Sequence, residues 1–253
     1  AFSYDARAVV GFEIGQPSVD AFRARMDVFG VANAKVQLAG PEEILEGALA
    51  AVEPATTFVF LAVVEHLLEE ERISYLRAAW NALHPGDLLV IAETPNYYAY
   101  FDGHTFGVPF ASMVPDPYFE RWLVQQGDGL RFGKDLRILA ETQGIEAALT
   151  QRRRLGLGVT HHAFELAFEQ DLNEIVVADA FQPPIVDWFP MSVDDRSLLT
   201  AFREYNIELP VGFARSVLSL AFRKPSSEAQ VRDTVRRNSE WRNEVIDRLA
   251  FTL

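Results

Sequence analysis

The sequence contains no cysteine, and this absence removes several classes of site at once. A chain without cysteine cannot form a disulfide framework, a thiolate metal site or a cysteine nucleophile. The sequence also lacks any uncharged apolar run of about eighteen residues, so no transmembrane span is expected. Its first residues lack the basic segment followed by an apolar stretch that marks a signal peptide. We therefore expect a cytoplasmic protein.

Positive charge is also scarce, and the formal net charge is −13. Binding to a phosphate backbone needs clustered lysine and arginine side chains. Only Arg152-Arg153-Arg154 forms a run of three basic residues, and such a run is typical of the solvated end of a helix or strand. The composition therefore disfavours a nucleic acid as partner.

The segment from Phe58 to Asn96 is the most informative part of the chain. Residues 58–64 and 88–92 are short apolar runs, as expected for strands buried on both faces of a parallel sheet. Apolar residues recur between them at helical spacing, namely Ile73, Leu76, Trp80 and Leu83. Acidic residues occupy the expected first turn, where the helix dipole favours them, and Pro85-Gly86 ends the helix. The pattern predicts a right-handed βαβ unit.

Two short motifs lie in this unit: Glu65-His66-Leu67 after the first strand and His84-Pro85-Gly86 before the second. The order of strand, EHL, helix, PG and strand resembles the fourth and fifth strands of class I S-adenosylmethionine (SAM)-dependent methyltransferases. Thr94-Pro95-Asn96 followed by D-x-H-T-x-G-x-P-F from Asp102 is similar to a bacterial, glycan-associated branch of that family. The resemblance implies a Rossmann-like three-layer α/β/α sandwich, mainly parallel, whose closing antiparallel strand is Val217 to Phe222.

The resemblance also implies a SAM site. Val9 to Ile14 resembles a strand that ends in an acidic residue, and a carboxylate there can accept hydrogen bonds from both ribose hydroxyls. Glu13 and Ile14 would then hold the ribose and the adenine edge. A third strand is expected at residues 35–40. The other residues expected at the cofactor are Gly40, Pro41, Glu42, Ala62, Val63 and His66. Two alternatives remain open: Glu13 as an ordinary strand-end acid, and Glu65-His66 as a structural turn.

The sequence departs from this family at its start. The family's first strand and glycine-rich loop precede the strand that ends in the ribose-binding acid. Here eight residues precede Val9, and no GxGxG occurs in the chain. We expect further natural residues upstream of Ala1; the alternative is a degenerate homologue without a complete site.

The segment after Asn96 is rich in aromatic and turn residues, and loops at the carboxyl ends of parallel strands are where α/β proteins build their sites. Asp102 and His104 are predicted as the catalytic pair, because a carboxylate can fix the tautomer of a histidine that titrates near neutral pH. The alternative is a histidine that caps the loop. Several aromatic residues could wall an acceptor pocket, namely Tyr97, Tyr98, Tyr100, Phe101 and Phe106.

A second polar cluster contains His161, His162 and Glu165, whose spacing is typical of metal ligands on one helix face. Adjacent histidines point in different directions on a helix, so only one is expected to pair with Glu165. The methyltransferase family does not generally need a metal, and we expect none. The three residues are predicted to bind the acceptor or to be structural.

Residues 1–224 are expected to form one methyltransferase-like domain with an insertion around 97–130, followed by a charged helix in 225–253. An apolar stripe marks one face of that helix: Val231, Val235, Trp241, Val245 and Leu249. Its polar face mixes acids and bases, so the stripe is expected to pack on the domain or on a second copy in a homodimer rather than on a membrane.

The resemblance implies an enzyme that transfers the SAM methyl group to an oxygen or nitrogen atom of a small-molecule or glycan acceptor. The missing glycine-rich loop keeps a rival open, a non-catalytic methyltransferase-like binding or scaffold protein. An NAD-dependent oxidoreductase would also place an acid on the ribose. The chain lacks the Tyr-x-x-x-Lys pair of such enzymes, and the EHL-to-PG segment is not their pattern.

Overall fold

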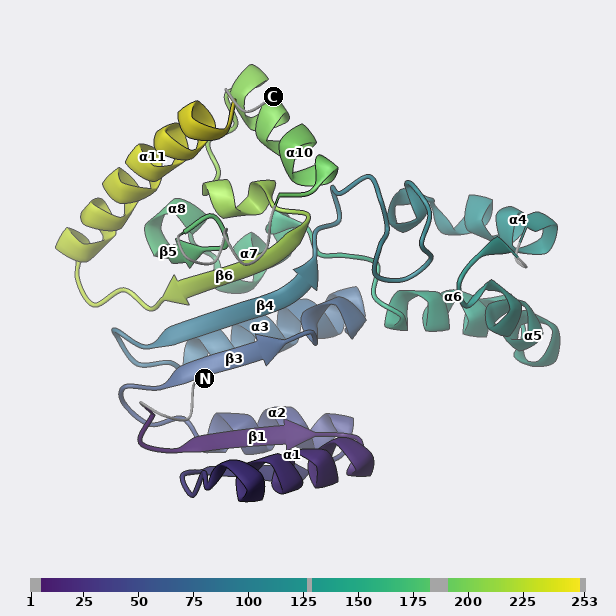
Figure 1. The fold of residues 1–253 in the computed structure, drawn as a ribbon, viewed down its shortest axis with the longest axis horizontal. Helices are drawn as coiled ribbons and strands as arrows, with labels where there is room; N and C mark the ends of the chain where they lie inside the picture. Colours follow the sequence, from purple (N-terminus) through teal and green to yellow (C-terminus); the bar gives the residue numbers. More distant parts are fainter. Residues whose placement is uncertain (1–5, 127–128, 183–190, 251–253) are drawn as a thin grey trace. The chain divides into compact units, whose positions relative to one another are not determined.

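The computed structural model describes residues 6–126, 129–182 and 191–250 (Figure 1). The chain divides into two compact units, Ala1–Thr56 and Thr57–Leu253. Within the described ranges, no helix combines the length and the apolar character needed to cross a bilayer.

The first unit contains two parallel strands, each followed by a helix. In chain order these are β1 (Val9–Glu13), α1 (Gln16–Phe29), β2 (Ala34–Leu38) and α2 (Pro41–Ala50). The strands pair from Val9 opposite Ala34 to Glu13 opposite Leu38, so both carboxyl ends lie at one edge. The strand that ends in Glu13 is confirmed. The helix α1 begins at Gln16, and Pro17 fits its first turn.

The second unit is built around a four-stranded sheet. Its first elements are β3 (Thr57–Leu61), η1 (Val64–His66), α3 (Glu69–Ala82) and β4 (Leu88–Pro95). A helical segment follows with η2 (Ala111–Met113), α4 (Asp116–Gln126), α5 (Gly133–Gln143) and α6 (Ile145–Arg154). The chain then forms α7 (His161–Phe168), α8 (Leu172–Ile175), β5 (Val176–Asp179), α10 (Val193–Glu204), η4 (Val211–Ala214), β6 (Val217–Arg223) and α11 (Glu228–Ala250).

The strand order in this sheet is β3-β4-β6-β5. β3 and β4 are parallel, and β6 runs antiparallel to both β4 and β5. Three of the four strands therefore point the same way, and β6 returns between two of them. The Rossmann-like α/β class and the closing antiparallel strand are confirmed.

The βαβ unit formed by β3, α3 and β4 follows the sequence pattern closely. Leu76 and Trp80 of α3 are buried, as are Leu89 and Ile91 of β4. These side chains come from the apolar positions of the two periodicities, 3.6 residues in the helix and 2 in the strand. The α3 N-terminus is closed by Glu71, whose carboxylate accepts a hydrogen bond from the Leu68 N–H at 3.0 Å.

The expectation for the first strand of this unit was wrong in two respects. β3 ends at Leu61 rather than at residue 64, because Ala62 adopts φ +51° and turns the chain into η1. β3 is also not buried on both faces, since Val59 is 40% exposed and Leu61 is 57% exposed. Val59 and Leu61 lie two residues apart and so share one face of β3, and within the described part of this unit that face is left open, whereas Phe60 on the other face is buried.

Residues 97–158, here called the lobe, leave the sheet and return to the same point. Asn96 and Val159 form a parallel bridge, with hydrogen bonds from Val159 N–H to Pro95 O (2.9 Å) and from Tyr97 N–H to Val159 O (3.2 Å). Figure 1 shows α4, α5 and α6 of the lobe extending away from the sheet. The lobe has its own core of Phe106, Ala111, Phe119, Leu123, Leu130, Leu136 and Leu149.

The arginine run ends α6, as expected, but the expectation of a solvated end is wrong for Arg152. Its side chain is buried, with Nη1 2.7 Å from Asp116 Oδ1 and Nη2 donating to the carbonyls of Ala111 and Val114. The guanidinium also lies over the Phe119 ring. Because Arg has several donors in a fixed fork, one side chain can tie α4, η2 and α6 together.

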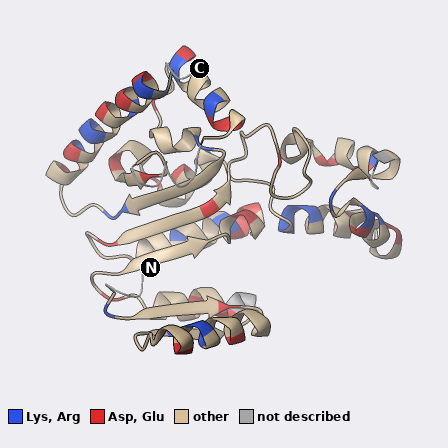
Figure 2. Cartoon of the chain, in the orientation of Figure 1, with Lys and Arg blue, Asp and Glu red and all other residues tan. Residues whose placement is uncertain are grey.

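The C-terminal helix α11 packs on its own unit. Val245 is fully buried, and Trp241 Nε1 donates a hydrogen bond to Asp179 Oδ2 of β5 at 3.0 Å. Figure 2 shows acidic and basic residues mixed along the rest of the helix. Val235 is 39% exposed, so the predicted stripe is only partly covered. The expected helix includes residues 251–253, which lie outside the described residues.

Candidate functional site

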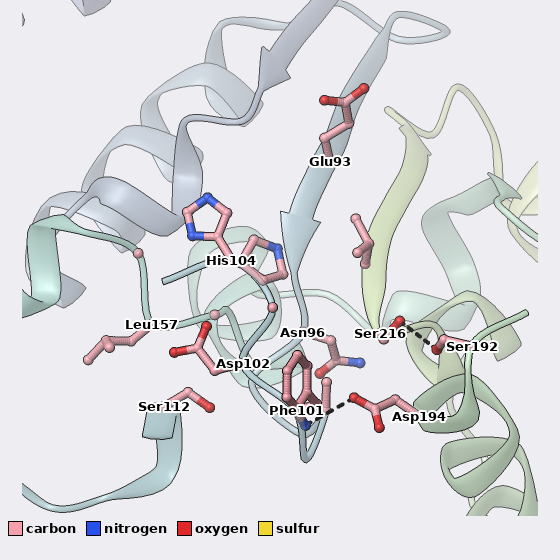
Figure 3. A pocket seen from close by; sticks show the side chains of 16 residues that line it. Glu93, Asn96, Phe101, Asp102, His104, Ser112, Leu157, Ser192, Asp194 and Ser216 are labelled. Carbon is pink, nitrogen blue, oxygen red and sulfur yellow. Dashed lines mark hydrogen bonds between the residues drawn. The ribbon is translucent and has the colours of Figure 1, made fainter. Parts of the chain in front are cut away.

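A cavity of about 360 Å³ opens beyond the carboxyl end of β4 (Figure 3). It is bounded by the end of β4, the loop from Ala99 to His104, the returning segment Gly156–Gly158 and the first turn of α10. Its size falls within the range of small-molecule sites, about 300–1,000 Å³. Two of the predicted residues, Asp102 and His104, line it.

Glu65 lies beside this cavity, in η1. Its side chain is fully buried, and Oε2 accepts a hydrogen bond from the Thr94 hydroxyl at 3.0 Å. Oε1 has no hydrogen-bond partner among the described residues. It lies 3.8 Å from His66 Nε2 and 3.9 Å from His104 Nε2. Glu65, His66 and His104 form the η1 cluster.

The outer nitrogens of the two histidines in the η1 cluster are held by other groups. His66 Nδ1 lies 2.9 Å from the Arg154 carbonyl oxygen, and His104 Nδ1 lies 3.1 Å from the Thr105 hydroxyl. That hydroxyl in turn reaches the carbonyl oxygens of Leu155 and Gly156. Both imidazoles are thus fixed by the last turn of α6 and the residues that follow it.

The predicted catalytic pair is arranged differently from a direct dyad. Both oxygens of the buried Asp102 carboxylate accept backbone hydrogen bonds, from Thr105 N–H at 2.7 Å and Phe106 N–H at 3.1 Å. Asp102 therefore shapes the loop that presents His104. The carboxylate that faces the His104 imidazole is that of Glu65. Sequence reasoning did not predict this arrangement, although the EHL motif contains Glu65.

The returning segment fits closely against the η1 cluster because it contains glycine. Gly156 has φ +95°, a region that residues with a Cβ rarely adopt. A Cβ there would lie 2.8 Å from His104 Cε1 and 3.1 Å from Glu65 Cγ. Gly158, at φ +83°, is similarly pressed against the backbone of Tyr97. Both positions require glycine for conformation and for space.

The predicted acceptor-binding residues of the second cluster form a separate group. His161, His162 and Glu165, the α7 cluster, lie in the first turns of α7, and the Tyr98 ring is 5.8 Å from the His161 ring. Only His162 pairs with Glu165, Nδ1 to Oε2 at 3.0 Å, as expected. None of these residues, nor Tyr97, is among the described residues that line the cavity. Of the predicted aromatic wall, Phe101 lines the cavity, whereas Phe106 belongs to the lobe core.

Burial alters the pKa values of two of these groups. It lowers the pKa of His161, and the neighbouring His162 acts in the same direction while Glu165 opposes it. It raises the pKa of Tyr98, and Tyr97 and Glu165 add to that effect. Both side chains are therefore held toward their neutral forms.

Sequence reasoning also missed the far wall of the cavity, which α10 supplies. Asp194 is buried there and its Oδ2 accepts a hydrogen bond from Phe101 N–H at 3.1 Å. Burial raises the pKa of Asp194, the Phe101 N–H opposes this, and Asp195 raises it further. The sequence offered one local indication of α10, the capping box formed by Ser192 and Asp195. A capping box predicts where a helix starts, but it does not predict that the helix lies beside the cavity.

The residues expected at the cofactor are divided between the two units. In the first, Glu13 Oε1 accepts hydrogen bonds from the N–H groups of Ile14 and Gly15, both at 2.9 Å. Gly40 N–H donates to Glu43 Oε2, and Pro41 and Glu42 begin α2. In the second unit, Ala62 and the exposed Val63 form the turn between β3 and η1, and His66 belongs to the η1 cluster.

No protein-family model and no curated protein matches the chain. Among solved structures it is similar to PKMT2 from Rickettsia typhi in complex with AdoHcy, at 12% identity and a TM-score of 0.44 over 89% of this chain and 45% of that one. It is also similar to a possible exported protein from Bordetella parapertussis, at 16% identity and a TM-score of 0.36, over 87% of this chain and 54% of that one. A third similar structure is the [4+2]-cyclase SpnF, at 12% identity and a TM-score of 0.34, over 89% of this chain and 69% of that one. The chain thus spans about half the length of the first of these structures, and at such identities the likeness concerns the fold alone.

Proposed function

We propose that this protein transfers the methyl group of SAM to an oxygen or nitrogen atom of a small-molecule or glycan acceptor. The observation that carries the proposal is the sheet order β3-β4-β6-β5, with antiparallel β6 between β4 and β5. The sequence resemblance implies a closing antiparallel strand, which β6 supplies, and the EHL motif follows β3 as the resemblance requires. Motif and topology support the same family.

The cavity beyond β4 supports an acceptor site in this proposal. An acceptor lone pair attacks the methyl carbon, the carbon–sulfur bond breaks, S-adenosylhomocysteine leaves and the acceptor loses a proton. Such a displacement at an activated carbon needs positioning and a water-poor site, with a base only where the acceptor must lose its proton. We assign His104 to the acceptor, as base or positioning group, and Asp102 to holding the His104 loop.

For the cofactor, the proposal assigns the ribose to Glu13 and the adenine edge to Ile14. The remaining assigned contacts are Gly40, Pro41 and Glu42 in the first unit, and Ala62, Val63 and His66 in the second. Glu13 accepts its two backbone hydrogen bonds through one carboxylate oxygen, so that the carboxylate is held at the end of β1.

Calorimetry on the full-length protein tests this proposal with SAM, S-adenosylhomocysteine and NAD as ligands. SAM and S-adenosylhomocysteine should bind, and Glu13→Ala should weaken SAM binding by about 1–3 kcal/mol, the cost of stranding hydrogen-bond partners. Glu46→Ala, at an exposed acid of α2, is the matched control and should leave binding unchanged. Tight NAD binding without SAM binding would overturn the proposal.

A further inference from the structure

We propose that Glu65, His66 and His104 bind a divalent transition-metal ion, with Zn²⁺ as the best fit, at the side of the cavity. Their ligand atoms lie within 4.8 Å of one another. Three further observations support a metal site: a buried carboxylate oxygen without a hydrogen bond, two histidine tautomers fixed by their neighbours, and hydrogen bonds that orient all three ligand side chains.

The first observation is the Glu65 carboxylate. It is fully buried, Thr94 satisfies Oε2, and Oε1 has no hydrogen bond within the described residues. A buried carboxylate oxygen without a donor is costly, and most buried polar atoms have a partner. A cation beside Oε1 removes that cost.

The second observation concerns where the histidine protons lie. A carbonyl oxygen can only accept, so the Arg154 carbonyl requires the proton of neutral His66 to be on Nδ1. The Thr105 hydroxyl uses its one proton on the carbonyls of Leu155 and Gly156, so it accepts from His104 Nδ1. In both neutral rings, therefore, Nε2 carries a lone pair.

These assignments bring three electron-rich atoms together. The two Nε2 lone pairs face Glu65 Oε1 across 3.8 and 3.9 Å. A direct N–H···O hydrogen bond needs about 2.7–3.2 Å, so a shared proton does not fit these distances. Zinc, with bonds of about 2.0–2.2 Å, holds tetrahedral ligand atoms roughly 3.4 Å apart. Small rotations of the two imidazoles close the remaining difference.

The third observation is the outer set of contacts. Metal-bound histidines donate their second N–H to an oxygen, and ligating carboxylates are themselves hydrogen-bonded. Here the Arg154 carbonyl holds His66, Thr105 holds His104 and Thr94 holds Glu65. Two imidazoles and a carboxylate favour Zn²⁺ or another transition metal over Mg²⁺ and Ca²⁺, which prefer oxygen ligands.

Three protein ligands leave a coordination position free, which is typical of a catalytic rather than a structural metal. His104 lines the cavity and its side chain is 33% exposed, so that position is accessible to a ligand in the cavity. An acceptor hydroxyl bound there would release its proton to solvent water more readily. His104 would then position the acceptor through the ion and would not itself take the proton. This last role rests on the proposed methyl transfer, whereas the metal site itself does not.

The test uses full-length protein freed of metal with a chelator and then titrated with Zn²⁺ alone, by calorimetry, without SAM. Co²⁺ titration followed by visible absorption gives a second readout of coordination by nitrogen and oxygen. Glu65→Gln, His66→Ala and His104→Ala should each reduce Zn²⁺ affinity at least about tenfold. His162→Ala, in the α7 cluster, and His84→Ala, beside Asp87, are matched controls and should bind as the wild type does.

Thermal unfolding checks that each variant is folded, and the nearly isosteric Glu65→Gln keeps the test decisive if a histidine variant is not. Unchanged affinity in Glu65→Gln would overturn the proposal, as would loss of binding in His162→Ala, or no binding by the wild type. Because metal binding is measured without SAM, its failure is separate from failure of the methyl-transfer proposal.

Discussion

The η1 cluster and the α7 cluster contain the same chemical groups, two imidazoles and one carboxylate, in opposite settings. In the α7 cluster the carboxylate is 39% exposed and pairs directly with His162 at 3.0 Å. In the η1 cluster the carboxylate is fully buried and lies beyond hydrogen-bond distance of both histidines. In the α7 cluster the carboxylate has a hydrogen-bonded histidine, whereas in the η1 cluster one carboxylate oxygen has no hydrogen bond within the described residues.

The difference teaches that ligand spacing in the sequence is a poor guide to a metal site. The α7 cluster comes from one helical turn, so any helix with these residues produces it. The η1 cluster needs β3, the lobe and the end of α6 to meet. Its outer partners, Thr94, Thr105 and Arg154, fix the direction of every ligand atom. The next four predictions test this contrast, from the largest expected effect to the smallest.

Gly156→Ala should have the largest effect. Placing a Cβ at φ +95° costs about 1–2 kcal/mol, and contact with His104 and Glu65 adds about 1–3 kcal/mol of overpacking. Gly86→Ala isolates the first cost, because Gly86 has φ +94° and no atom within 4 Å of the added Cβ. Denaturant unfolding of both variants measures the difference. Equal losses would mean that the η1 cluster tolerates the added methyl group.

Thr105→Val should reduce the free energy of unfolding by about 1–3 kcal/mol, because it leaves buried carbonyl groups of Leu155 and Gly156 without their donor. It should also weaken Zn²⁺ binding, since His104 loses the group that fixes its tautomer. Thr142→Val, on the exposed face of α5, should change stability by less than about 0.5 kcal/mol. Chemical denaturation compares the two, and similar losses would contradict the role given to Thr105.

Glu65→Gln should stabilise the metal-free protein by roughly 1 kcal/mol, because the amide N–H can donate to a histidine lone pair and a buried charge is removed. The same protein should gain no stability from Zn²⁺, whereas the wild type should. Glu165→Gln in the α7 cluster should lie within about 0.5 kcal/mol of the wild type under both conditions. Melting temperatures of the wild type and both variants, with chelator and with Zn²⁺, give the six values. A destabilised, metal-free Glu65→Gln would show that Oε1 already has a donor.

His161 should give the smallest effect, seen as a pH dependence. Its pKa is lowered by burial and by His162, so between the folded and unfolded pKa values the unfolded chain binds more protons. Its contribution is therefore complete above the unfolded pKa, near 6.5, and is lost as pH falls through the folded pKa. In the variant His161→Phe, the melting temperature should decrease less than in the wild type as the pH falls below ~6.5. An unchanged slope would mean that another group causes the fall.

Sequence periodicity predicted only part of the fold. The β3–α3–β4 unit follows from the apolar spacing of residues such as Leu76, Trp80 and Ile91, because each contact is set by local geometry. The closing strand that the resemblance implied at Val217 to Phe222 is also present, as β6. The double burial expected for β3 failed because an apolar run does not reveal whether both faces of its strand are covered.

The candidate site was only partly predictable, for a related reason. His104 was predicted from its loop and lines the cavity, but its proximity to Glu65 was not predicted, because tertiary packing brings the two together. Asp194 reaches the cavity from a helix whose first turn carries only a capping signal. Arg152 was assigned to solvent because a run of three arginines does not show that one of them anchors the lobe.

The paired ends of the lobe have a consequence for how this protein could change. Asn96 and Val159 are adjacent, so the two ends of the lobe meet at the sheet as the ends of a short turn would. The length of residues 97–158 therefore has little effect on the sheet. The lobe has its own apolar core, yet it contributes both His104 and Gly156 to the cavity wall. Exchange of this segment between relatives would therefore replace one wall of the cavity while leaving the strands of the sheet and their register intact. The lobe is thus a natural unit for recombination, and a practical one for changing what the cavity can bind.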